Sequence, residues 1–229
     1  SWALAETANF RVFHNVEPAR AEEVVRIAEA TRVAMQQKWF GKVEEDWNPR
    51  CDVYLHPHAD TYARQTGVRG SAPGHARTSM RGERVVERHL HMRLDAPNML
   101  TTILPHETTH VVLAGRFGPF AVPRWADEGM AVLTEPREQV ARHLQNLPAH
   151  RDEQTLFQVQ GLMEMREYPH PRQIGAFYAQ SVSVVEYLSS LKGPQTFAQF
   201  LADGLRGGYE PALRKHYGMQ GYQDLQTRW

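Results

Sequence analysis

Two histidines and an adjoining glutamate have the types and spacing of a metal-dependent hydrolase. His106, Glu107 and His110 stand in the sequence His-Glu-Thr-Thr-His. If this stretch is helical, residues four apart lie on one face, so both imidazoles can reach a single ion. Glu107 would stand beside that ion and act as a general base on a metal-activated water. The alternative is a surface helix that carries two solvated histidines.

Glu128 is the candidate third ligand. It lies five residues after Pro123, and His110 lies five residues before Gly115. At about 1.5 Å per residue, His110 and Glu128 are each about 7.5 Å from the connecting loop. If the two helices are antiparallel, these two residues would therefore lie side by side. Two nitrogens and one oxygen, with a fourth position open for water, match catalytic zinc. We therefore expect one Zn²⁺ per chain, held by His106, His110 and Glu128.

A second pair of histidines competes for the role of metal ligands. Residues two apart on a strand share a face, so His89 and His91 could grip an ion together. No third ligand stands near them in the sequence, and two ligands make a poor site. We interpret them as histidines on the half-solvated face of an edge strand.

Three segments and one long helix form the expected N-terminal scaffold. Alternating or strand-like patterns predict strands at residues 9–13, 50–56 and 85–94. Pro18 opens a helix whose apolar residues recur at helical spacing up to Phe40.

Prolines mark the expected ends of the helices that hold the candidate ligands. Pro105 lacks an N–H, so a helix that approaches His106 must kink there or begin afresh. Pro123 suits the first turn of the Glu128 helix, and Pro136 would end it. Residues 137–229 carry apolar positions at helical spacing, and we predict that they are mostly helical.

Composition limits the classes of partner. The chain has 229 residues, 41% of them hydrophobic, which is enough for one sizeable domain. Its 26 basic residues balance 26 acidic residues, so we expect no nucleic-acid partner. No apolar run approaches the length of a membrane span. The single cysteine, Cys51, excludes an intrachain disulfide and a cysteine-rich metal site.

The first residues bear on location. The chain begins with Ser1, and Ala3-Leu4-Ala5 resembles the tripeptide of a signal-peptide cleavage site. This beginning fits a processed mature protein or a trimmed chain, and no apolar h-region precedes the tripeptide to support a signal peptide. Composition leaves the compartment open, and we favour an extracytoplasmic location, secreted or periplasmic, over a cytoplasmic one.

The chain contains two motifs, His106-Glu107-Thr108-Thr109-His110 and Trp125-Ala126-Asp127-Glu128-Gly129-Met130-Ala131. With both motifs included, the chain resembles the gluzincin metallopeptidases. It is most similar to the peptidase MA-like group of largely uncharacterised bacterial proteins. Similarity extends to the opening strand and helix, a helix near residues 177–188 and the closing residues 225–229.

The resemblance implies an α+β, zincin-like fold. A small mixed sheet with a backing helix and the active-site helix would form residues 1–115, and helices would form residues 116–229 of the same catalytic domain. The strand at residues 85–94 would be the sheet edge along which an extended peptide lies. His89 and His91 would then line that groove or face away from it, and would not bind the metal.

The resemblance also implies an activity, hydrolysis of a peptide or protein substrate. Glu107 would be the general base and Tyr178 the donor to the oxyanion, with Tyr168 and His170 as alternative donors. Thermolysin-like members carry an aspartate four residues after the zinc glutamate, where this chain has Val132. Asp127, Glu135 or a backbone carbonyl would orient the ligating histidines instead.

Two other functions remain open on the sequence. One is a binding module that keeps the zincin fold and its metal without cleaving a substrate. Retention of Glu107 argues against it, because a structural metal site needs no base. The other is metal-dependent hydrolysis of a carbonyl that is not a peptide.

Overall fold

The computed structural model describes residues 3–68 and 72–229, and it has an α+β architecture, as predicted. The chain divides into two compact units. The first comprises Ser1–Gln37 and Lys42–Pro119, and the second comprises Lys38–Gly41 and Phe120–Trp229. Each unit has its own buried apolar core. Among the described residues, none of the helices combines the length and apolar character that a membrane crossing requires.

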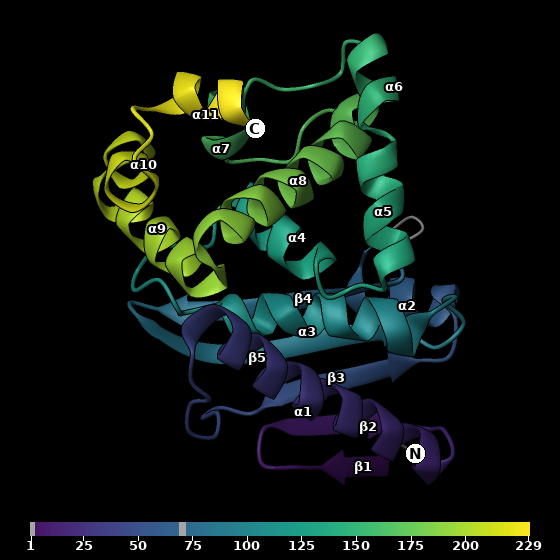
Figure 1. Cartoon of the computed structure of the whole chain (residues 1–229). Coiled ribbons are helices and arrows are strands. Elements are labelled where there is room, and N and C mark those ends of the chain that lie inside the picture. Colours follow the sequence, from purple (N-terminus) through teal and green to yellow (C-terminus); the bar gives the residue numbers. More distant parts are fainter. Residues whose placement is uncertain (1–2, 69–71) are drawn as a thin grey trace. The chain divides into compact units, whose positions relative to one another are not determined.

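A mixed β-sheet forms the centre of the first unit (Figure 1). Within the described part of the chain it has five strands, in the order β1-β2-β3-β5-β4. The strand β3 runs parallel to its neighbours β2 and β5, whereas the outer pairs β1/β2 and β4/β5 are antiparallel. The strands are β1 (Ala3–Glu6), β2 (Phe10–His14), β3 (Cys51–His56), β4 (Gly74–Arg81) and β5 (Arg84–Arg93).

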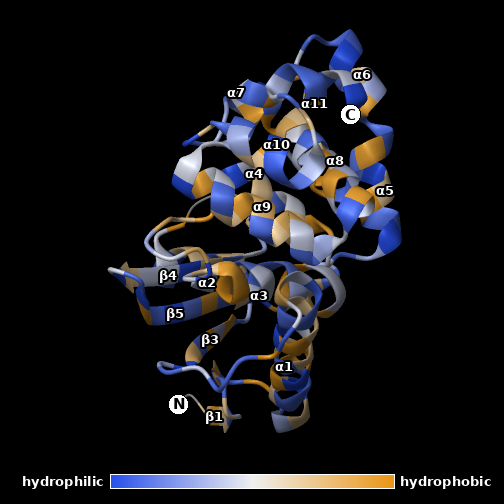
Figure 2. Ribbon diagram, turned by 60° about the vertical axis from the view of Figure 1, so that its left-hand side comes forward, coloured by the Kyte–Doolittle hydropathy of each residue, from blue (hydrophilic) through white to orange (hydrophobic). Residues whose placement is uncertain are grey.

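Alternation along the strands separates a buried face from a half-buried face. Val12, Val53 and Leu90 are cross-strand neighbours, and all three side chains are fully buried. Two helices, α1 (Pro18–Phe40) and α3 (Leu104–Leu113), run along one face of the sheet in both Figure 1 and Figure 2. The helix α3 packs against β4 and β5. The helix predicted to begin at Pro18 is therefore confirmed as the backing helix of the sheet.

The prediction that residues 85–94 form the sheet edge is wrong. The strand in question, β5, lies between β3 and β4, and β4 is the outermost strand on that side of the described sheet. We did not predict β4 because Gly-His-Ala-Arg-Thr-Ser-Met-Arg has few of the β-branched and aromatic residues that favour strands. Figure 2 shows β4 and β5 largely in hydrophilic colours. Gly82, at φ 60°, allows the tight turn that returns the chain as β5.

A change of helix type lies beside Pro105, where the sequence predicted a kink or a new helix. A π-helical turn at Met99–Ile103 precedes α3, and the N–H of Leu104 donates to the carbonyl of Met99. Pro105 then occupies an early position of α3, and the change from π-helical to α-helical hydrogen bonding takes place at this proline, which cannot donate a hydrogen bond. The short helix α2 (Ala59–Thr66) completes the first unit and contacts β3 and β5.

The second unit is helical, which confirms the prediction for residues 137–229. Its central helix, α8 (Ile174–Lys192), packs against α4 (Arg124–Val132) and three further helices (Figure 1). The last turn of α1 belongs to this unit, and the Trp39 ring lies 5.7 Å from that of Phe197. The remaining helices are α5 (Arg137–Gln145), α6 (Leu147–Asp152), α7 (Val159–Met163), α9 (Pro194–Gly207), α10 (Tyr209–Tyr217) and α11 (Tyr222–Arg228), with a 3₁₀ turn at Pro171–Gln173.

Candidate metal centre

The helix α3 presents the two predicted histidine ligands side by side. His106 and His110 are separated by one helical turn, and their ring centroids lie 4.9 Å apart. Thr108, Val111 and Val112 are buried in the same helix, which fixes the rotation of α3 about its axis. The prediction of a helix over residues 106–112 is confirmed, and with it the placing of both imidazoles on one helical face.

In the second unit, α4 carries Glu128 among buried neighbours. The residue is only 4% exposed, and Trp125 and Met130 of the same helix are fully buried. Gly129 allows α4 to approach α8 closely, because a Cβ there would lie 2.6 Å from the carbonyl oxygen of Ser181. A buried carboxylate is costly unless it is hydrogen-bonded, paired or bound to a metal. The location of Glu128 is therefore typical of a functional carboxylate.

Tyr168, in the loop after α7, is a hydrogen-bond partner of Glu128. Its hydroxyl donates to Oε1 of the carboxylate. The guanidinium of Arg124 lies over the tyrosine ring, 4.4 Å from its centroid, and the Phe177 ring meets it edge to face at 5.8 Å. Burial, and next the negative charge of Glu128, raise the pKa of Tyr168. The phenol is therefore a protonated donor at neutral pH.

His106, His110 and Glu128 form a group that could hold a metal ion. Each offers one ligand atom, and these atoms all lie within 4.8 Å of one another. Two imidazole nitrogens and one carboxylate oxygen suit zinc and several other transition metals. Among residues 3–68 and 72–229, this is the one group of three or more histidine, cysteine or acidic side chains with such spacing.

Glu107 lies half-buried in the first turn of α3. Its negative charge acts on two residues of the first unit. Burial raises the pKa of Tyr62 to about 12, and Glu107 adds to that rise. Burial lowers the pKa of His75, whereas Glu107 opposes the change. Glu107 is therefore electrostatically coupled to α2 and to the first residues of β4.

The candidate oxyanion donors occupy different surroundings. Tyr178 lies on α8, with its ring centroid 5.5 Å from Phe177 and 6.1 Å from His143. Its role as a donor to the oxyanion stays a prediction. The side chain of His170 accepts a hydrogen bond from the N–H of Arg172 and so caps the 3₁₀ turn. Tyr168 contacts the predicted metal ligand Glu128 through its hydroxyl.

Histidines of the sheet form a separate cluster, which the sequence did not reveal as a whole. His75, His91 and Tyr54 stack across β4, β5 and β3, with ring centroids 4.9 Å and 4.8 Å apart. The Nε2 of fully buried His56 lies 3.0 Å from Nδ1 of His91, and Tyr62 Oη lies 2.6 Å from Nδ1 of His75. Stacked imidazoles do not direct their nitrogens at one point, so this cluster is not a metal site.

Burial keeps the cluster uncharged. Loss of hydration, and next the neighbouring histidines, lower the pKa of His91 to about 3. The pKa values of His56 and His75 are also lowered, chiefly by burial. At neutral pH these imidazoles stack as neutral aromatic rings.

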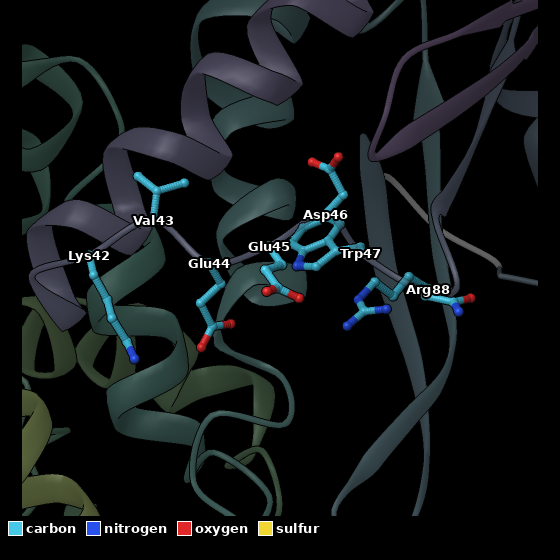
Figure 3. Close-up of a pocket in the computed structure, with 8 residues that line it drawn as sticks. Lys42, Val43, Glu44, Glu45, Asp46, Trp47 and Arg88 are labelled. Carbon is cyan, nitrogen blue, oxygen red and sulfur yellow. The ribbon is translucent and has the colours of Figure 1, made fainter.

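A shallow hollow of about 520 Å³ lies elsewhere in the first unit, lined by residues 42–48 and Arg88 (Figure 3). Arg32 and Arg88 each place a guanidinium over the Trp47 ring, 5.0 Å and 4.8 Å from its centroid. Arg32 also donates to the carbonyls of Glu44 and Glu45, and the Glu44 carboxylate pairs with Arg116. These contacts tie the loop to the sheet and helix, and we interpret the hollow as structural.

No known protein-family model matches the chain, and comparison with curated proteins finds no similar sequence.

Proposed function

We propose that the protein is a zinc-dependent peptidase of the gluzincin type, with a zincin-like fold. The observation that supports this most strongly is the group of His106, His110 and Glu128, whose ligand atoms lie within 4.8 Å of one another. Glu107 adjoins the first ligand on the same helix, where a general base is needed. Two histidines and one glutamate leave a coordination position open, which is the arrangement of catalytic zinc.

The chemistry divides between the ion and the chain. Zinc, when bound, would polarise a carbonyl and lower the pKa of a water to about 7. Glu107 would accept the proton of the attacking water and then deliver it to the leaving amine. Tyr178 would donate a hydrogen bond to the developing oxyanion. This phenol does not need to ionise for the role.

The position of β4 supports a peptide as substrate. This strand lies at the edge of the described sheet, and α3 packs against it. An edge strand can pair with an extended peptide through backbone hydrogen bonds, which do not depend on the sequence of the peptide. The substrate groove that was expected beside residues 85–94 is therefore proposed to lie beside β4 instead.

Cleavage of a broad peptide library by the wild-type protein and by Glu107→Gln tests the proposal. Loss of a general base typically lowers the rate by about 10²–10⁴-fold. We expect the variant to keep its zinc, since Glu107 is not a ligand, and to lose cleavage. Glu22→Gln, on the exposed side of α1, is the matched control and should cleave like the wild type.

Two results would contradict the peptidase assignment. If wild type and Glu107→Gln both bind zinc and neither cleaves any peptide, a non-catalytic metal-binding module is the better description. If both cleave at equal rates, Glu107 is not the base.

A further inference from the structure

The contact between Tyr168 and Glu128 is a hydrogen bond, and further side chains hold the tyrosine ring in place. The tyrosine ring is held by Arg124 over its face, by Phe177 in an edge-to-face contact, and by Glu128 at its hydroxyl. Arg124 and Glu128 are one turn apart on α4, so a single helix grips both the ring and the hydroxyl. Although Tyr168 is 43% exposed, its hydroxyl reaches a carboxylate that is only 4% exposed.

A carboxylate on a glutamate side chain can rotate, and rotation weakens its value as a metal ligand. A hydrogen bond to one oxygen restricts this rotation and leaves the other oxygen for the ion. Partners of this kind typically change metal affinity by about 10–100-fold when they are removed. The kind of donor also matters. A neutral phenol orients the carboxylate while its negative charge stays available to a cation, whereas a guanidinium in the same position would compete with the ion.

We propose that Tyr168 is a positioning residue for metal binding: its hydroxyl holds Oε1 of Glu128 and so restricts the rotation of the carboxylate that would bind the ion. This inference rests on the metal centre of the proposed function. It assigns to Tyr168 a role distinct from donation to an oxyanion, because it acts through Glu128 before any substrate binds. Arg124 and Phe177 hold the ring at the distance that the hydrogen bond requires.

The test measures zinc affinity of the full chain by competition with a chromophoric chelator, for wild type, Tyr168→Phe and Tyr187→Phe. The first variant removes the hydroxyl and keeps the ring between Arg124 and Phe177. In excess chelator we expect its thermal unfolding midpoint to fall only by the amount that one hydrogen bond to a buried carboxylate contributes. We expect its zinc dissociation constant to rise by about 10-fold or more. Tyr187→Phe, the control, removes a hydroxyl from α8 and should leave zinc affinity unchanged.

A spectroscopic readout separates orientation of the ligand from general loosening. Cobalt absorbs visible light in a way that depends on its coordination, so cobalt-loaded Tyr168→Phe should show a shifted spectrum relative to cobalt-loaded wild type and Tyr187→Phe. Equal zinc affinity and an unchanged cobalt spectrum in Tyr168→Phe would overturn the role of Tyr168 while the metal centre stands. Failure of the wild type to bind zinc or cobalt would instead remove the metal centre, and this inference with it.

Discussion

Gly129→Ala should destabilise the second unit, although alanine is the better helix former. The added methyl would lie 2.6 Å from the Ser181 carbonyl oxygen and 2.6 Å from Cγ2 of Val185. Both contacts are on α8, and the first is to backbone, which cannot rotate away as a side chain does. The helices α4 and α8 must therefore separate, and Glu128 adjoins the point of contact.

The magnitude follows from two opposing contributions to the free energy of unfolding. Alanine gains about 1 kcal/mol over glycine inside a helix. Overpacking by a methyl group costs about 1–3 kcal/mol, and a clash with backbone belongs at the upper end. We therefore expect a net loss of about 2 kcal/mol, the difference between about 3 from overpacking and about 1 from helix propensity.

Urea unfolding at pH 7 in excess chelator, followed by circular dichroism, measures this loss without a contribution from bound metal. Since the chain forms two compact units, amide hydrogen exchange in α8 should be measured as well, because it reports the stability of the second unit alone. Gly161→Ala is the matched control. A Cβ at this exposed position of α7 meets no atom within 4 Å, so the substitution should be neutral or slightly stabilising.

A Gly129→Ala protein as stable as wild type, with unchanged exchange in α8, would refute the reasoning. It would mean that the two helices are not in the close contact that places Glu128. Destabilisation of both variants to the same degree would also count against it, because the loss would then not depend on the contact with α8.

Two further predictions concern the first unit. His91 has a folded-state pKa of about 3, below its ordinary value of 6.5, so its contribution to stability is complete above pH 6.5 and is lost as the pH falls from there towards 3. An NMR titration should give His91 a midpoint below 4.5, about two units under the ordinary value, and a midpoint near the ordinary value would refute the buried stack. Asn9→Ala should cost about 1–3 kcal/mol in urea unfolding, because buried Asn9 accepts from the N–H of Trp47 at 2.7 Å and donates to Glu29. A cost under about 0.5 kcal/mol, the usual range of a surface substitution, would show that this network is dispensable.

The local sequence pattern was sufficient to predict most of the N-terminal helix and strands. The helix Pro18–Phe40 has a proline at its start, apolar residues at helical spacing and a glycine after its end, so the boundaries agree with the prediction. The strand β3 alternates clearly. By contrast, β4 depends on its pairing with β5, and its own residues do not favour a strand. The edge of the sheet was therefore misplaced by one strand.

In the candidate site, too, some residues could be predicted from the sequence and others could not. His106, Glu107 and His110 are recognisable because their spacing along one helix already defines their geometry. Tyr168 stands forty residues after Glu128 in an irregular loop, so no spacing rule connects the two. The stack of His75, His91 and Tyr54 depends on how three strands are aligned with one another, and the sequence of a single strand does not determine that register.

Metal content of the purified protein tests the central claim most directly. Elemental analysis of wild type, His106→Ala and Glu128→Ala should be made after dialysis against zinc and then against zinc-free buffer. We predict about one zinc per wild-type chain, as expected for a mononuclear catalytic site, and its loss in both variants. Full zinc content in the two variants, or none in the wild type, would contradict the account.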